Sequence, residues 1–186
     1  MKIDITFCVT PQIADNAQKN EKRVLVGHLG THFDVMDKEF PLDYTERKGI
    51  VFDVSTVKER DIDIFDIDMD SVEKNMFVAF YTGFIEEEGY GTEKYFHAHP
   101  QLSEGLIEML LEKEISIIGV DFAGIRRGKE HPLKDKQCAD RGTFVVENLC
   151  SLKKAVDMGG KFLAHTYPMK YAGVSGLPCR VIAEIL

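Results

Sequence analysis

Residues 76–83 (MFVAFYTG), 102–113 (LSEGLIEMLLEK) and 115–124 (ISIIGVDFAG) decide which fold this chain is expected to adopt. The first and third stretches are short and apolar, which is typical of strands buried inside a sheet. The middle stretch repeats apolar side chains at helical spacing, and Ser103 could cap its start. A helix between two buried strands indicates a crossover, so part of the sheet should be parallel or mixed.

Further strand signals lie on both sides of this unit. Strands are predicted at residues 2–9, 23–29 and 50–55, and residues 162–185 hold two strand-like runs around a turn. A second helix is expected over residues 146–158, where two glycines follow as a stop signal. These patterns predict an α/β protein with many strands and few helices.

The composition limits the class of protein. A chain of 186 residues with 44% apolar side chains is long enough for one core, so a single domain over residues 1–186 is expected. The net charge of −8 argues against nucleic acid or an anionic membrane as partner. The four cysteines lack CxxC spacing, and no export signal or spanning segment is evident. We therefore expect a cytoplasmic protein with free thiols and a small-molecule substrate.

The segment VGHLGTHFDV places three metal-binding side chains, His28, His32 and Asp34, close together. On an extended strand His32 and Asp34 share one face, and a bend at Gly30 would let His28 join them. Two imidazoles and a carboxylate suit Zn²⁺, Mn²⁺ or Fe²⁺ better than Ca²⁺ or Mg²⁺. The alternative is one buried histidine, one surface histidine and an aspartate that caps a turn.

This segment resembles the signature HxGTHxDxPxH of the cyclase-like metal-dependent hydrolases, a family that includes the bacterial kynurenine formamidases. Residues 28–34 match its first seven positions. The resemblance continues in order through FPLDYTERKGIVFDVS, VAFYTGF, HPQLSEGLIEMLLEKEISIIGVDFAG, GTFVVENL and PMKYAGVSGLPCRVIAEI. It implies a compact swivelling β/β/α barrel-like domain with a mixed sheet, assembled as a homodimer or homotetramer with the metal site near a subunit contact.

The resemblance also implies roles for single residues. His28, His32 and Asp34 would bind a divalent metal, with Zn²⁺ or Mn²⁺ favoured, and Asp34 could bridge a second ion. Glu147 would be a carboxylate ligand or would orient the reacting water. In the sequence Glu147 follows an apolar strand and precedes a helical pattern, so a surface glutamate at a helix start is the alternative.

Two positions depart from the family pattern. Lys38 stands where the signature ends in a histidine that serves as general acid or base, and a lysine suits that task only if its pKa falls by several units. Lys38 could still stabilise negative charge. Asp135 stands at the place of a histidine for the second ion, and His131 lies four residues earlier. Either could supply a second ligand set, or both could be exposed to solvent, so one or two ions remain open.

The remaining histidines and one aspartate are weaker candidates. His97 and His99 could share a strand face, but a structural role is favoured for both, and His165 is similar. Asp121, after a buried strand, is expected to accept hydrogen bonds from backbone donors and not to meet substrate.

These observations predict a metal-dependent hydrolase that uses activated water to cleave a small amide, formamide, lactam or lactone, most often at a carbon–nitrogen bond. Glu147 would orient the water. The alternative is a divergent, non-catalytic member of the same fold that binds a metal or a ligand, because two expected histidines are replaced at Lys38 and Asp135. A purely structural metal site is disfavoured, because such sites usually close four ligands with cysteine prominent.

Overall fold

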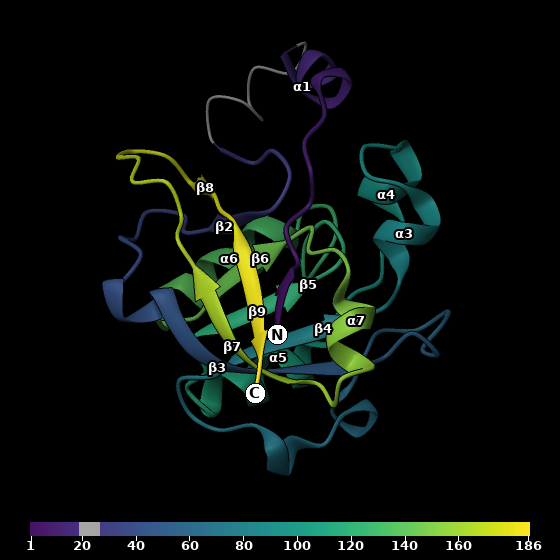
Figure 1. Cartoon of the computed structure of the whole chain (residues 1–186), viewed down its shortest axis with the longest axis vertical. Coiled ribbons are helices and arrows are strands. Elements are labelled where there is room, and N and C mark those ends of the chain that lie inside the picture. The colour runs from purple at the N-terminus through teal and green to yellow at the C-terminus, as the bar shows by residue number, and fades with distance from the viewer. Residues whose placement is uncertain (19–26) are drawn as a thin grey trace.

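The structure, a computed structural model, describes residues 1–18 and 27–186. These residues form a curled mixed sheet with short helices around it (Figure 1). The strand predicted at residues 23–29 falls mostly outside the described residues, and its described end, residues 27–29, lies in a turn. The strands are β1 (Lys2–Asp4), β2 (His32–Asp34), β3 (Glu46–Asp53), β4 (Phe77–Tyr81), β5 (Ile117–Val120), β6 (Phe144–Glu147), β7 (Lys161–Thr166), β8 (Gly176–Pro178) and β9 (Val181–Ile185).

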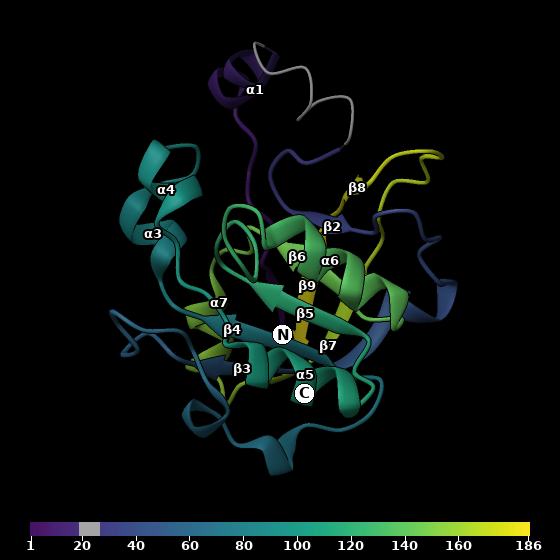
Figure 2. The same cartoon turned by 180° about the vertical axis from the view of Figure 1, so that it is seen from behind.

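Helices are short and lie outside the sheet (Figures 1 and 2). The α-helices are α1 (Pro11–Gln18), α3 (Phe84–Glu88), α4 (Glu93–His97), α5 (Glu104–Glu112), α6 (His131–Asp140) and α7 (Leu152–Val156). The 3₁₀ turns are η1 (Leu42–Thr45), η2 (Ile64–Asp66) and η3 (Met69–Ser71). No helix among the described residues is long and apolar enough to cross a membrane.

The strand order is β1-β9-β7-β3-β4-β5-β6-β2-β8. The four central strands, β3 to β6, run parallel to one another. The flanking strands pair antiparallel, with β7, β9 and β1 on one side and β2 and β8 on the other. The predicted α/β class with a mixed sheet is therefore confirmed, as is the crossover through α5.

The sheet separates two apolar layers because successive side chains of a strand point to opposite faces. In β4, Val78 and Phe80 belong to the layer that contains Leu106 of α5. Phe77 lies in the other layer, where its ring packs against Phe162 of β7. Helix α5 begins where it was predicted, because the hydroxyl of Ser103 accepts a hydrogen bond from the Leu106 amide at 3.1 Å.

The helix predicted over residues 146–158 is wrong in its first half. Val146 and Glu147 are the last residues of β6, and α7 begins only at Leu152. Asn148 and Ser151 adopt left-handed backbone angles, with φ of 58° and 57°, so a right-handed helix cannot pass through them. Glu147 therefore lies at the carboxyl end of a buried parallel strand.

Helix α6 was not predicted, because its sequence, HPLKDKQCAD, has no apolar stripe at helical spacing. Its buried side chains are Asp135, Cys138 and Ala139, and Pro132 lies in its first turn, where a missing amide hydrogen is tolerated. The helix joins β5 to β6 and carries His131 and Asp135 one turn apart. A polar helix is thus packed against the sheet, with a carboxylate on its buried side.

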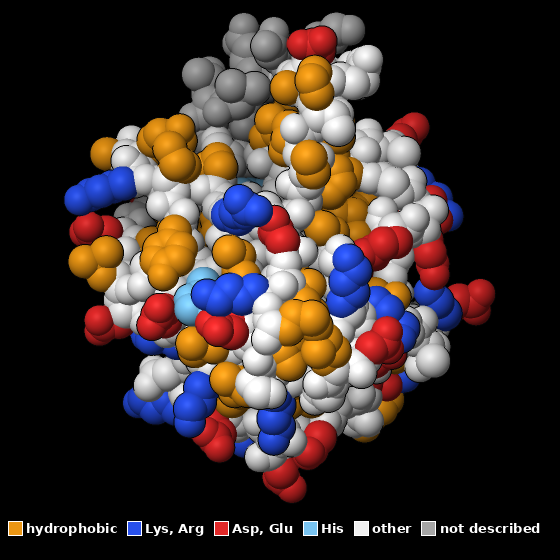
Figure 3. Space-filling model, viewed as in Figure 1, with side chains coloured by type: hydrophobic (Ala, Val, Ile, Leu, Met, Phe, Trp, Pro, Cys, Tyr) orange, Lys and Arg blue, Asp and Glu red, His pale blue; other side chains and the backbone are white. Residues whose placement is uncertain are grey.

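Hydrophobic side chains gather over the loop between β7 and β8 on the face viewed in Figure 3. Tyr167, Met169 and Tyr171 of this loop are each at least half exposed. Together with residues 35–40, Leu42 and Thr45 they line a groove of about 940 Å³. Acidic and basic side chains are scattered over the rest of this face, between further hydrophobic groups (Figure 3).

Candidate metal centre

Strand pairing and one left-handed glycine build the centre of the site. In β2, His32 and Asp34 point to the same side because they are two residues apart. The antiparallel pairing of β2 with β6 places His32 opposite Glu147. Gly30 has φ of +66°, which reverses the chain so that the His28 ring returns to meet His32 edge-on, at 4.7 Å between ring centroids.

The ligand-type atoms of the motif converge. His28 Nδ1 lies 3.0 Å from both His32 Nε2 and Asp34 Oδ1. His32 Nε2 lies 3.7 Å from Asp34 Oδ1 and 3.6 Å from Glu147 Oε2. Asp34 is part of β2 and therefore caps no turn, and both imidazoles meet its carboxylate.

A second group of ligand-type atoms adjoins the first and shares Asp34 with it. His131 Nε2 lies 2.9 Å from Glu147 Oε1 and 3.0 Å from Asp135 Oδ2. Within each group the atoms lie within 4.8 Å of one another. Asp135 and Glu147 are buried, so the alternative of a solvent-exposed Asp135 is wrong, and so is that of a surface Glu147.

Three buried carboxylate oxygens of this cluster lack a hydrogen-bond partner among the described residues: Asp34 Oδ2, Asp135 Oδ1 and Glu147 Oε1. Glu147 Oε1 is at ion-pair distance from His131 without an aligned hydrogen bond. A buried, unpaired carboxylate oxygen is unfavourable unless a cation or donor meets it. The mixed nitrogen and oxygen donors therefore fit a divalent cation.

The carboxylates of the cluster differ in acidity because of their surroundings. Burial, reinforced by the charge of Asp34, raises the pKa of Glu147 to about 8 and that of Asp135 to about 6. Burial also opposes ionisation of Asp34, but the imidazoles of His32 and His28 outweigh it and hold the pKa of Asp34 at about 2. Asp34 is therefore the permanent anion at the centre of the cluster.

The histidines of the cluster also differ in the direction of their pKa shifts. Burial lowers the pKa of His32, because it disfavours the charged form of the ring. Burial also opposes protonation of His131, but the charges of Glu147 and Asp135 outweigh it and raise the pKa of His131 to about 12. For His28 burial is likewise outweighed, chiefly by Asp34, and the pKa rises.

The Gly30 carbonyl orients the His32 ring, and two residues outside the motif hold that carbonyl in place. His32 Nδ1 donates to the carbonyl of Gly30 at 2.8 Å, and Asn148 Nδ2 donates to the same carbonyl at 2.9 Å. Tyr95 donates its hydroxyl hydrogen to Asn148 Oδ1 at 2.7 Å. Neither Asn148 nor Tyr95 was predicted, although Asn148 directly follows Glu147 in a polar pair that ends an apolar strand, and that was the available signal.

Lys38 lies apart from this cluster. Its ammonium nitrogen is 2.8 Å from Asp140 Oδ1 and 3.8 Å from Asp37 Oδ1 on the surface. No ion pair joins Lys38 to the cluster within the part of the chain that the structure describes. Its catalytic role stays a prediction, and the structure gives the ammonium a different partner.

The weaker candidates lie outside the cluster. His99 is buried and stacks on Phe122, and burial lowers the pKa of His99 to about 4. His165 Nε2 meets Glu184 Oε2 at 2.8 Å on a flanking strand. Asp121 accepts hydrogen bonds from the backbone of Thr82, as predicted. These three side chains make contacts within the fold and belong to neither group of ligand-type atoms.

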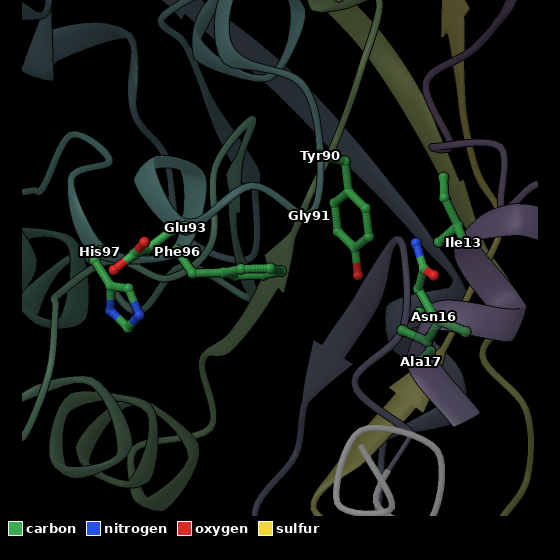
Figure 4. A pocket seen from close by; sticks show the side chains of 9 residues that line it. Ile13, Asn16, Ala17, Tyr90, Gly91, Glu93, Phe96 and His97 are labelled. Carbon is green, nitrogen blue, oxygen red and sulfur yellow. The ribbon is translucent and has the colours of Figure 1, made fainter. Parts of the chain in front are cut away.

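A cavity of about 460 Å³ opens beside the motif, between α1 and the segment that follows α3 (Figure 4). Tyr90 and Phe96 line one side, and Ile13 and Asn16 of α1 line the other. Leu29, which separates His28 from Gly30, also lines it. The Tyr90 hydroxyl accepts a hydrogen bond from the Gly30 amide at 3.0 Å, so the cavity wall and the motif are joined directly.

Known proteins resemble this chain in sequence and fold. The family model described as "Putative cyclase" matches residues 3–126. A solved structure of a potential metal-dependent hydrolase with cyclase activity is 25% identical, with a TM-score of 0.76 over 98% of this chain and 96% of that one. No curated protein matches the chain.

Two further solved structures are less similar in sequence and show the fold alone. A predicted metal-dependent hydrolase from Bacillus stearothermophilus is 22% identical, with a TM-score of 0.72 over 98% of this chain and 97% of that one. Isatin hydrolase A from Labrenzia aggregata, bound to benzyl benzoate, is 18% identical, with a TM-score of 0.71 over 86% of this chain and 74% of that one.

Proposed function

This chain belongs to the cyclase family, and from that we propose that it is a metal-dependent hydrolase acting on a small amide, formamide, lactam or lactone. One observation carries the proposal. Three buried carboxylate oxygens without hydrogen-bond partners face the histidines of the same cluster. Such a donor set is unfavourable by itself and suited to a divalent cation with positions left for water.

His28, His32 and Asp34 would hold one cation, and Asp34, His131, Asp135 and Glu147 would hold a second. Zn²⁺ or Mn²⁺ is the proposed metal, because mixed imidazole and carboxylate donors favour these ions over Ca²⁺ and Mg²⁺. A bound ion would supply Lewis-acid activation of water and of the substrate carbonyl.

Glu147 and His131 would move the proton. A general base works best when its pKa lies near the working pH, and burial with Asp34 raises the pKa of Glu147 to about 8. Glu147 Oε1 would accept a proton from the attacking water and return it to the leaving atom of the substrate. With only the first cation bound, His131 Nε2, 2.9 Å away, would stabilise the carboxylate form of Glu147 before it takes up the proton and after it returns it.

The cavity beside Leu29 would accommodate the substrate. Its walls combine apolar and aromatic side chains with polar groups at Asn16 and His97, which suits a small molecule with one polar end. Isatin is a cyclic amide, so the similarity to isatin hydrolase supports the lactam within the proposed range of substrates.

The alternative function is that of a non-catalytic metal- or ligand-binding member of the family. Lys38, which replaces the expected histidine, pairs with Asp140 on the surface. That observation removes one acid or base from the reaction, although Glu147 and His131 remain available.

The test combines metal analysis with a substrate panel. Purified protein would be assayed for bound metal and for turnover of N-formyl aromatic amines, cyclic imides and lactones. His32→Ala should lose both metal and turnover, while His165→Ala, a histidine on a flanking strand, should keep both. Turnover in metal-stripped protein would refute the hydrolase mechanism, and tightly held metal without turnover on any panel member would favour the alternative.

We further propose that the protein forms a homodimer or homotetramer and works in the cytoplasm. The exposed side chains of Tyr167, Met169 and Tyr171 support an assembly, because apolar groups gathered on a surface often mark a protein contact. Light scattering of the parent and of Tyr171→Asp would test this, and a parent that is monomeric at micromolar concentration would contradict it.

A further inference from the structure

His28 is the member of the motif that the sheet holds least firmly. Its side chain is 27% exposed, whereas that of His32 is 3% exposed and that of Asp34 is 2% exposed. His32 and Asp34 lie in β2, between β6 and β8, but His28 precedes the strand and lies in no regular element. A fixed orientation of the His28 ring therefore needs a side-chain partner outside β2.

Ser175 is that partner. Its Oγ lies 3.0 Å from His28 Nε2, on the side of the ring opposite the nitrogen that faces the cluster. His28 Nδ1 lies 3.0 Å from Asp34 Oδ1 and 3.0 Å from His32 Nε2. A neutral imidazole carries one proton, so a hydrogen on Nε2 that is donated to Ser175 leaves a lone pair on Nδ1.

The backbone of Ser175 fixes the position of this hydroxyl. The Ser175 carbonyl accepts hydrogen bonds from the amides of Val35 at 2.8 Å and Met36 at 3.0 Å. The next residue, Gly176, pairs with Asp34 across β2 and β8. Ser175 is therefore tied to the same strand as Asp34, through contacts that do not involve its side chain.

His32 presents the other ring nitrogen, Nε2, to the cluster. Its Nδ1 lies 2.8 Å from the Gly30 carbonyl, and a carbonyl only accepts, so Nδ1 carries the hydrogen and Nε2 offers the lone pair. We propose that Ser175 is a positioning residue that directs Nδ1 of His28 to the cation, while His32 binds through Nε2. This inference rests on the proposed metal site and adds the nitrogen used by each ring.

The hydroxyl can be removed and restored without touching a ligand. Ser175→Ala keeps the two backbone hydrogen bonds and loses the contact to His28, and Ser175→Thr restores a hydroxyl. Ser103→Ala is the control, because it removes a helix cap far from the motif in sequence and should lower the melting temperature without changing metal affinity. Zn²⁺ affinity would be measured by competition with a chromogenic chelator.

Loss of a residue that orients a ligand typically weakens metal binding by about 10- to 100-fold, so Ser175→Ala should bind Zn²⁺ at least about 10-fold more weakly. Ser175→Thr should recover most of that loss. In ¹⁵N-labelled, Zn²⁺-loaded parent protein, ring spectra should show the hydrogen of His28 on Nε2 and that of His32 on Nδ1.

Two results would overturn the inference while leaving the metal site intact. One is a Ser175→Ala variant that binds Zn²⁺ within about twofold of the parent. The other is a loaded spectrum with the hydrogen of His28 on Nδ1. A parent protein that binds no Zn²⁺ would overturn the inference together with the metal site on which it rests, so the two failures are distinguishable.

Discussion

Buried carboxylates lie at the carboxyl ends of two neighbouring parallel strands, and their surroundings differ. Asp121 follows β5, and both of its oxygens are paired. Its Oδ2 accepts hydrogen bonds from the amides of Thr82 and Gly83 at 2.8 Å and 2.7 Å, and its Oδ1 accepts one from the Thr82 hydroxyl at 2.5 Å. The Asp121 site is complete with donors from its own chain.

The cluster of Asp34, Asp135 and Glu147 is different. Glu147 ends β6, the strand beside β5, yet one oxygen of each of these carboxylates has no hydrogen-bond donor among the described residues. Ligands commonly bind at the carboxyl ends of parallel strands, and both Asp121 and Glu147 lie there. Position at a strand end therefore does not separate a structural carboxylate from a metal-binding one. The two kinds of carboxylate differ instead in whether hydrogen-bond donors of the chain reach all of their oxygens.

The largest effect should come from matched substitutions in the two regions. Asp34→Asn removes the anion shared by both ligand groups and should weaken Zn²⁺ or Mn²⁺ binding by more than about 100-fold. Asp121→Asn changes a carboxylate whose oxygens are already paired and should keep the full metal content. Metal analysis after dialysis against a weak chelator checks both. Equal metal loss in the two variants would erase the distinction between the regions.

Metal addition should stabilise the protein through the cluster alone. A cation that binds only the folded state adds about 2.7 kcal/mol to the free energy of unfolding when its concentration is 100 times Kd. Urea unfolding with and without Zn²⁺ should show this gain in the parent and in Asp121→Asn. Asp34→Asn should show almost none, and a full gain in that variant would place the cation elsewhere.

Much of the fold was predictable because local patterns determine it. The short apolar run of β4 and the apolar stripe of α5 indicated a mixed sheet with a crossover, and Ser103 marked the start of the helix. Helix α6 was missed because its buried side includes Asp135, so hydrophobic periodicity is absent. The left-handed angle at Asn148 also gave no periodic signal.

From the residues alone the candidate site was predictable only where its members are close in sequence, and Glu147 and Asp135 were indicated by the family resemblance. His28, His32 and Asp34 are separated by a bend and a strand, and their convergence follows from local geometry. Ser175 lies 147 residues from His28, and strand pairing alone brings it there. Contacts of that kind require the sheet order, which a single sequence does not contain.

In metal-free protein the cluster should make stability depend on pH. Burial and the charge of Asp34 raise the pKa of Asp135 to about 6, so the folded state holds that proton more tightly than the unfolded chain. This contribution is fully present below the unfolded value of 3.8 and is lost as the pH rises through about 6.

Asp135→Asn removes the part of this dependence that comes from Asp135. At about pH 8, metal-free Asp135→Asn should be more stable than the metal-free parent by about 3 kcal/mol, measured by urea unfolding in the presence of a chelator. With saturating Zn²⁺ the order should reverse, because the variant has lost a ligand. A metal-free variant that is less stable than the parent at this pH would mean that Asp135 is satisfied within the chain, as Asp121 is.

The smallest effect on metal binding should come from Asp121→Asn, which should change only the free energy of unfolding. In Asp121→Asn one carboxylate oxygen becomes an amide group that cannot accept hydrogen bonds, so either the amides of Thr82 and Gly83 or the Thr82 hydroxyl lose their acceptor. Buried donors without an acceptor destabilise a fold by about 1–2 kcal/mol each. Urea unfolding should show a loss of that size in metal-free and metal-loaded protein alike. A loss confined to the loaded form would connect Asp121 to the cation, and the two groups of carboxylates would then form one site.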